Sequence, residues 1–392
     1  MKKILLLITV LQLLYIPGIL SQPAVDTEIY LLTCGPGTET YSIYGHSALR
    51  IVIPEKKFDL VYNWGLFDFD TPHFAWKFAK GRLNYMVGYT TLTNFLKEYN
   101  YEKRFVISQK INLNQEETDK LVTLLNENLK PENVEYRYDF LYDNCSTRIR
   151  DILEKSIGNK LFYPPDEVKK AVPTFREMIN KYQMNTLWLD FGIDLLLGSP
   201  CDKKAFFRDR MFLPIEMQKE LSKAVVNRDN KMVPLLSNPE TVLDFSVPGY
   251  KQNFLTSPSM VFTLFFIIVI ILTSSVKRRK MTDYVDIAVL SIFSVLSLVM
   301  IFFNFFTDHQ QTEMNFNILW LNPLLIICLI LLIMKKPGIV WHKIVFYITL
   351  IFIALMAFLP QGFNLATVPL ILLILVRSSA RAGFSWNPFS LK

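Results

Sequence analysis

The spacing of hydrophobic residues divides the chain into two parts. Up to about residue 254, apolar residues alternate with polar ones or recur at helical spacing, as they do in a water-soluble domain. From Pro258 onward, long apolar runs dominate the sequence. A membrane-spanning helix needs about 20 such residues. The pattern therefore predicts a water-soluble domain followed by a membrane domain.

The first part mixes two periodicities. Alternation, with many β-branched and aromatic residues, predicts strands at residues 28–34, 45–53, 58–65, 83–90 and 104–113. Helical spacing predicts helices at residues 72–81, 91–100, 114–129, 145–158, 173–182, 188–198 and 214–226. Asn114 is a natural helix cap and Gly158 a natural helix stop. The fold class that we expect is α+β, with helices packed on an antiparallel sheet.

The second part contains five apolar runs. They predict spans at residues 258–276, 287–306, 318–334, 344–359 and 363–376. The last run is short and contains Asn364, Thr367 and Pro369, so it is expected to be tilted or only half inserted. Five spans are more than an anchor needs. They favour a groove for a lipid substrate, with simple anchoring and partner contact as the alternative.

The N-terminus has the layout of a signal peptide. Lys2 and Lys3 precede an apolar stretch at residues 4–16, and small or polar residues follow as far as Ser21. We therefore expect a signal peptide at residues 1–21, an exported domain at 22–254 and a transmembrane domain at 255–392. An uncleaved anchor is the alternative, and it exports the same domain.

The net charge of +7 does not indicate nucleic-acid binding, because the basic residues of the second part border the spans. They lie after spans one, three and five, at residues 277–280, 335–343 and 377–381, whereas the loops after spans two and four contain no Lys or Arg. Lys and Arg favour the cytoplasmic side. This bias and the signal peptide agree that the first domain is outside.

Cysteines are few, and three of the four lie in the exported part: Cys34, Cys145 and Cys201. An odd number leaves at least one free thiol, and the sequence leaves open whether Cys34 and Cys201 form a disulfide. The chain contains no CxxC or HExxH motif, and its four histidines are scattered. We therefore expect no metal site and no cofactor.

Cys145 is the candidate nucleophile. Asn144 can cap the helix that follows, which places the thiol in its first turn, where the helix dipole favours a thiolate. Arg148, one turn later, could assist or bind substrate. The alternative is a cysteine packed as a small hydrophobe, although the surrounding "YDNCSTR" is polar.

His46 is the candidate base. It opens an apolar strand after Gly45, a residue that leaves room beside the imidazole, although an ordinary core histidine is the alternative. His73 follows a proline at a helix start and is interpreted as a structural or surface residue. Asn63, in the neighbouring strand, could orient the imidazole, and Tyr44 and Asp68 are weaker candidates. Ser42 and Ser47 lack the GxSxG context of a serine hydrolase.

A histidine on a strand followed later by an "NC" helix reverses the order of papain. This order resembles the circularly permuted branch of the NlpC-type papain-like superfamily, to which lecithin:retinol acyltransferase belongs. Four stretches resemble the Bacteroides-type lipoprotein N-acyltransferase family (Lnb) more closely. They are "LLTCGPGTETYSIYGHSALRI", "YNWGLFDFDTPHFAWKFAKGRLNYMVG", "YDFLYDNCSTRIRDIL" and "DHQQTEMNFNILWLNPLL". Residues 199–230 and the last two spans match only in general character.

The resemblance implies a circularly permuted papain-like (NlpC-type) periplasmic domain and a transmembrane bundle in a bacterial inner membrane. It also implies a Cys145 nucleophile and a His46 base, with His309 as a substrate-side residue or an ordinary loop histidine. The implied reaction moves an acyl chain from a phospholipid donor, through a Cys thioester, to the α-amine of a diacylglyceryl-cysteine lipoprotein. The alternatives are a cell-wall peptidase or amidase and a non-catalytic envelope assembly protein.

Overall fold

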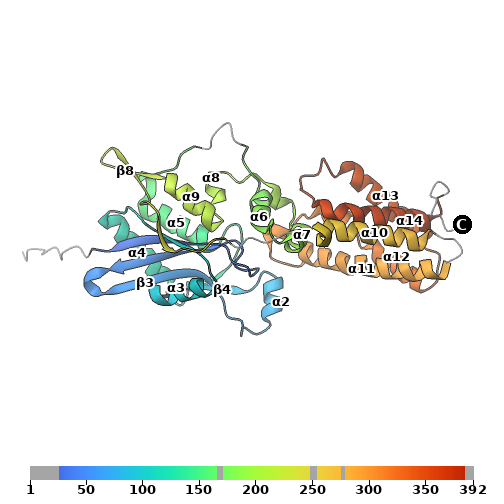
Figure 1. Ribbon diagram of the computed structural model, residues 1–392, viewed down its shortest axis with the longest axis horizontal. Helices are drawn as coiled ribbons and strands as arrows, with labels where there is room; N and C mark the ends of the chain where they lie inside the picture. Colours follow the sequence, from blue (N-terminus) through green and yellow to red (C-terminus); the bar gives the residue numbers. More distant parts are fainter. Residues whose placement is uncertain (1–25, 166–170, 248–253, 275–278, 385–392) are drawn as a thin grey trace, which may run out of the picture.

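The computed structural model describes residues 26–165, 171–247, 254–274 and 279–384. The predicted signal peptide lies outside the described residues. Figure 1 shows a sheet-containing part and a helical bundle placed end to end along the long axis. The α+β domain followed by a helical membrane part is confirmed.

The five predicted strands form the centre of one antiparallel sheet. They are β1 (Glu28–Cys34), β2 (His46–Ile53), β3 (Phe58–Leu66), β4 (Asn84–Thr91) and β5 (Val106–Lys110). Two strands that the sequence analysis missed, β6 (Glu135–Arg137) and β10 (Glu240–Leu243), complete the order β10-β5-β1-β2-β3-β4-β6. β2 and β3 pair with Ala48 opposite Asn63, which sets the distance between the candidate base and its candidate partner.

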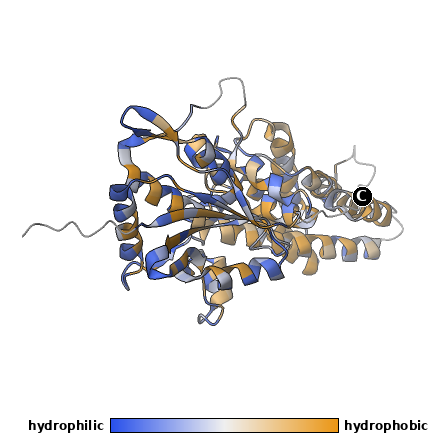
Figure 2. Cartoon of the chain, turned by 60° about the vertical axis from the view of Figure 1, so that its left-hand side comes forward, coloured by the Kyte–Doolittle hydropathy of each residue, from blue (hydrophilic) through white to orange (hydrophobic). Residues whose placement is uncertain are grey.

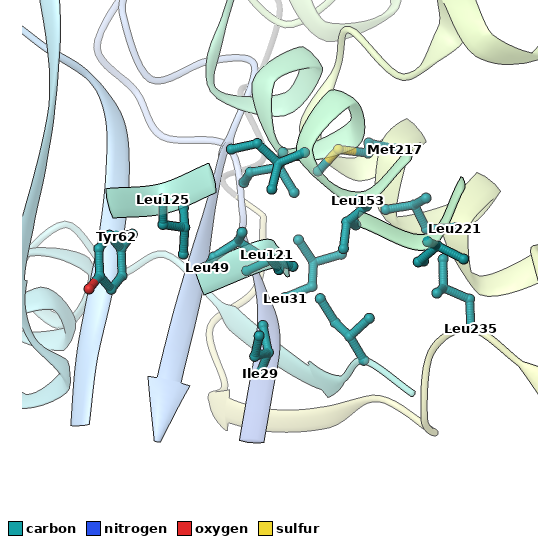
Figure 3. Close-up of a cluster of buried hydrophobic side chains, with 14 of the residues drawn as sticks. Ile29, Leu31, Leu49, Tyr62, Leu121, Leu125, Leu153, Met217, Leu221 and Leu235 are labelled. Atoms are coloured by element: carbon teal, nitrogen blue, oxygen red, sulfur yellow. The ribbon is translucent and has the colours of Figure 1, made fainter. Parts of the chain in front are cut away.

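Helices cover both faces of this sheet. On one face, α4 (Gln115–Asn128), α5 (Cys145–Ile157) and α9 (Pro214–Lys223) enclose a core that includes Leu31, Leu49, Leu121, Leu153 and Leu221, as Figure 3 shows. On the other face, α3 (Leu92–Tyr101) buries Phe95 and Tyr99 against Leu32 and Ala48. The core on the first face fixes α5, and with it Cys145, against the sheet.

Smaller elements link the sheet to the bundle. The helix predicted at 214–226 ends at Lys223, because Val225–Arg228 forms β8 between β7 (Leu161–Phe162) and β9 (Lys231–Pro234). The connecting helices are α2 (Phe74–Ala79), α6 (Phe175–Gln183), α7 (Leu187–Leu196) and α8 (Phe207–Arg210). Of these, α7 approaches the membrane part, since the Trp188 indole donates to the Thr256 carbonyl at 2.9 Å.

In the described residues, the membrane part consists of five apolar helices. They are α10 (Pro258–Thr273), α11 (Arg279–Phe305), α12 (Leu324–Ile333), α13 (Ile339–Leu355) and α14 (Val368–Ala382). Among the described residues, three stretches are long and apolar enough to span a membrane, namely Lys280–Phe305, Phe316–Ile333 and Leu365–Ala382, while α10 and α13 are shorter. Figure 2 shows the hydrophobic character of the bundle.

The prediction that the last span ends at residue 376 is wrong. The helix continues to Ala382, because Arg377 is buried and pairs with Asp286 of α11 at 2.7 Å. Arg381 also reaches Asp286, at 2.5 Å. Arg377 therefore lies inside the bundle as half of an ion pair and does not mark the end of the helix.

The two loops that were predicted to face outward both lie against the exported part. From the loop after α11, Asn315 and Asn317 donate to the Leu195 carbonyl at 2.9 and 3.1 Å. From the loop after α13, the Gly362 N–H donates to Asp202 at 2.9 Å. These contacts agree with the orientation that the signal peptide and the charge bias predict.

Gly198 provides a test of this junction. Its N–H donates to the Gln311 carbonyl at 2.7 Å, and a Cβ at this position would lie 1.8 Å from the Glu313 carbonyl oxygen. We expect Gly198→Ala to lower the stability of the full-length protein in detergent by about 1–3 kcal/mol, measured by thermal unfolding. Gly192→Ala is the control, because a Cβ there meets nothing within 4 Å and alanine favours the helix. Equal stability of the two variants would contradict close packing of the two parts at Gly198.

Candidate active site

His46 is the first residue of β2, and the backbone before it requires glycine. Gly45 has φ +82°, and a Cβ there would lie 2.7 Å from the Cys34 carbonyl oxygen. Room for the imidazole, the reason expected from the sequence, is not what requires this glycine. In the structure, its left-handed backbone and its approach to β1 account for it.

Cys145 begins α5, and Asn144 caps this helix as predicted. The Asn144 Oδ1 accepts from the N–H groups of Ser146 and Thr147 at 2.9 and 3.0 Å. Its Nδ2 donates to the carbonyls of Phe140 and Phe212 at 2.7 and 3.0 Å. The cap is buried and held on both sides, so the first turn of the helix, and the thiol on it, has a fixed position.

The structure brings Cys145, His46 and Asn63 together. His46 hydrogen-bonds Cys145, and its Nε2 lies 2.5 Å from the Asn63 Oδ1. Because an amide oxygen can only accept, Nε2 carries the proton in this bond, and Nδ1 is the nitrogen left for the sulfur. All three side chains are half-buried.

The pair favours charge separation. Burial alone would raise the pKa of the Cys145 thiol, but the charge and hydrogen bond of His46 outweigh it and lower that pKa. For His46, burial opposes the charged form, while the Cys145 thiolate and the bond to Asn63 raise the imidazole pKa. A thiolate facing an imidazolium is the reactive form of a thiol nucleophile.

One helix N–H remains for an oxyanion. Asn144 occupies the N–H groups of Ser146 and Thr147, whereas the Cys145 N–H donates to no acceptor among the described residues. A donor adjacent to the nucleophile is suited to an oxygen that becomes negative during attack.

Two serines support the thiol, and one of them, Ser47, was set aside above as a nucleophile. The Ser47 backbone N–H and the Ser146 side chain both hydrogen-bond Cys145 and lower its pKa. Their hydroxyls are buried and lie 3.4 Å apart, which joins the first turn of α5 to the start of β2. Sequence reasoning missed this role. The only signal for it was that each serine directly follows a candidate catalytic residue.

Other candidates have partners elsewhere. Arg148 forms an ion pair with Asp143, at 2.5 Å, and its guanidinium lies 3.6 Å from the centre of the Tyr136 ring. Its role in substrate binding stays a prediction. The weaker candidates for the orienting residue face other groups: Tyr44 receives a hydrogen bond from Gln183, and Asp68 accepts from the Asp70 N–H.

The other two thiols of the exported domain are not reactive. Cys34 and Cys201 are both free and fully buried, in separate hydrophobic clusters, so the disulfide left open above does not form. Burial raises the pKa of each to about 12. The described part of the chain holds no group of three or more His, Cys, Asp or Glu side chains that could bind a metal.

The loop after α11 contacts two pieces of the exported domain near the site. His309 Nε2 lies 3.0 Å from the Phe78 carbonyl of α2, and Phe303 stacks on its ring. Gln311 donates to the Asp139 carboxylate at 2.7 Å. Since Asp139 also accepts from the N–H of Leu141 at 2.9 Å, the membrane part holds the loop that leads to Cys145.

Asn63 is the third residue to test. Removal of its carbonyl takes a hydrogen bond from the charged imidazole, an interaction worth about 1.5–3 kcal/mol, so Asn63→Ala should slow thiol acylation roughly 10- to 100-fold. The measurement is the rate of modification of Cys145 by an activated ester. Asn63→Asp retains an acceptor and should recover most of the rate. If the Asn63→Ala rate equals that of the wild type, Asn63 does not orient His46.

Comparison with known families follows the same division of the chain. Residues 22–180 match the Lnb N-terminal periplasmic domain, and residues 250–384 match the Lnb transmembrane domain. No curated protein and no solved structure matches the chain. The sheet domain is therefore periplasmic, and the apolar helices make this a multi-pass protein of the inner membrane. The chain belongs to the Lnb family, and this membership suggests an enzyme of lipoprotein N-acylation.

Proposed function

We propose that this protein is a lipoprotein N-acyltransferase that moves an acyl chain from a phospholipid to the α-amine of a diacylglyceryl-cysteine lipoprotein. The observation that carries the proposal is the Cys145–His46–Asn63 arrangement. It lies in a periplasmic domain, and the membrane part holds the loop that leads to α5. A thiol in this place can reach lipids of the outer leaflet.

In the first half-reaction, the Cys145 thiolate attacks the carbonyl carbon of a phospholipid ester. The carbonyl oxygen becomes negative and accepts a hydrogen bond from the Cys145 N–H. When the tetrahedral intermediate collapses, the ester C–O bond breaks, and the leaving alkoxide takes a proton from the His46 imidazolium. The products are a lysophospholipid and an acyl thioester on Cys145.

In the second half-reaction, the free α-amine of the lipoprotein attacks the thioester. Neutral His46 accepts the proton that the amine loses, the C–S bond breaks, and an amide forms. Cys145 leaves as a thiolate beside an imidazolium, which is the starting state. Amines attack thioesters readily compared with water, and the membrane part would help to keep water out.

The direct test is mass spectrometry of a lipoprotein N-terminus after incubation with the full-length protein and phospholipid. A gain of one acyl chain on the α-amine is the expected result. The assay needs the membrane part, because this part holds the loop before Cys145. Release of muropeptides without lipoprotein acylation would overturn the proposal in favour of a cell-wall peptidase or amidase.

The ion pair predicts a bell-shaped pH dependence for acylation of Cys145. The rate should rise as the pH passes the lowered pKa of the Cys145 thiol, because the thiolate then forms. It should fall as the pH passes the raised pKa of His46, because the leaving alkoxide then lacks its proton donor. The measurement is the initial rate of acyl-enzyme formation at a series of pH values. A rate that keeps rising into the alkaline range, as that of an ordinary thiol does, would contradict the Cys145–His46 ion pair.

A further inference from the structure

A series of aromatic rings runs from α2, a helix that contacts the membrane part, toward the candidate active site. At the membrane end, Trp76 of α2 packs on Phe302 of α11, with ring centres 5.5 Å apart. The same helix supplies Phe74 and Phe78 to a separate series of rings, the aromatic track, which comprises Phe67, Phe69, Phe74, Phe78, Tyr85 and Tyr138. The candidate active site described above does not include these rings.

Each ring of the track touches the next. Phe78 stacks on Phe74 at 6.2 Å, and Phe74 lies 5.8 Å from Phe67. Phe67 lies 5.3 Å from Tyr85, and Tyr85 stacks on Tyr138 at 4.5 Å. The rings come from the β3–α2 loop, α2, β4 and the segment before α5, so the tertiary fold alone joins them.

The track is open at its membrane end. Phe69 is 70% exposed and Phe78 53% exposed, and the adjoining Trp76 is 58% exposed. A contiguous patch of this kind marks a surface that binds an apolar partner. Lys80 lies over the Trp76 ring at 5.3 Å, a pairing of Lys and Trp that suits the boundary between membrane and water. α2 also bonds the loop after α11 through the Phe78 carbonyl and His309.

The other end of the track lies near the thiol. Tyr85, Tyr138 and Cys145 are all half-buried and pack on the same core cluster. Burial and then the negative charge of Cys145 raise the pKa of Tyr138, as expected for a phenol close to a thiolate. An apolar chain that follows the track from the bilayer therefore ends close to the sulfur.

We propose that the aromatic track binds the fatty acyl chain of the phospholipid donor and guides its ester carbonyl to Cys145. This proposal rests on the proposed function. In the acyl-enzyme, the chain is covalently joined to the sulfur, so it needs an apolar surface that begins there. The acceptor's own chains are attached through its thioether sulfur, several bonds from the amine that reacts, and need no such continuity.

The experiment measures acylation of Cys145 in the full-length protein, in nanodiscs, with phosphatidylethanolamines of defined chain length. Intact mass reports the acyl-enzyme. Phe69→Ala and Phe74→Ala should each slow acylation by palmitoyl lipid about tenfold or more, because a large aromatic contact is lost. Both should retain the wild-type rate with a hexanoyl lipid, whose chain is too short to extend far along the track. That difference separates a binding role from a general loss of structure.

Tyr89→Ala is the matched control. Tyr89 is a 60% exposed aromatic residue on β4, outside the track, and its substitution should leave both rates unchanged. If the track variants keep the wild-type rate and chain-length profile, the track proposal fails while the proposed function stands. If they acylate normally but transfer slowly to a diacylglyceryl peptide, the surface serves the acceptor, which also overturns the proposal. If the wild type forms no thioester with any phospholipid, the proposed function itself fails.

Discussion

Cys145→Ala should leave the lipoproteins of the cell diacylated while the protein still reaches the membrane. Without the sulfur, no covalent intermediate forms, and the loss of a nucleophile typically lowers turnover by roughly 10⁴-fold or more. The Cys145 side chain is small and only half-buried, so the fold should survive the change. Mass spectrometry of lipoprotein N-termini from cells with wild-type and variant protein measures the effect.

Alkylation of the wild-type protein supplies the control. Iodoacetamide should label Cys145 well before Cys34 or Cys201, because the pKa of Cys145 is lowered while burial raises those of the other two to about 12. Full N-acylation by Cys145→Ala would end the thiol mechanism. Labelling of Cys145 no faster than a free thiol would favour a non-catalytic envelope protein.

His46→Ala should have the second-largest effect, with acylation of Cys145 slowed by about 10²- to 10⁴-fold, the usual worth of a general acid–base group. The thiol loses the charge and the hydrogen bond that lower its pKa, and the leaving alkoxide loses its proton source. The variant should also lose the bell-shaped pH profile. Its rate should instead rise with pH as an ordinary thiol ionises.

The matched control is His73→Asn. His73 is exposed at the start of α2 with φ +59°, a conformation that Asn adopts more readily than most residues. It should acylate at the wild-type rate. If His46→Ala keeps a wild-type rate and pH profile, the base is another group.

Sequence patterns predicted the helices and strands that show a clear pattern in their own residues. The central strands were predictable because β1, β2 and β3 are seven to nine residues long and contain several β-branched or aromatic residues, with alternation in places. β7, with two residues, and β6, with three, are too short to show a period. The end of α14 was missed for another reason: Arg377 is a border signal in sequence, and only its partner Asp286, on another helix, explains its burial.

The candidate site divides in the same way. Cys145, His46 and Asn63 were predictable because a helix cap and neighbouring strands place them, and the register with Ala48 opposite Asn63 explains how the amide reaches the imidazole. Two other contacts could not be predicted from the sequence: the hydrogen bond from the Ser47 N–H to Cys145 and the hydrogen bond from Gln311 to Asp139. Both depend on where segments distant in sequence meet, which periodicity does not encode.

The junction between the two parts also sets an order on biosynthesis. Leu195 and Asp202 leave the ribosome before Asn315 and Gly362, which supply their hydrogen bonds. Domains generally fold from the N-terminus during synthesis. Here, the segments around Leu195 and Asp202 can form their contacts only after the later helices have been inserted. A defect in insertion of α13 or α14 should therefore register in the periplasm, as misplacement of the segment around Asp202.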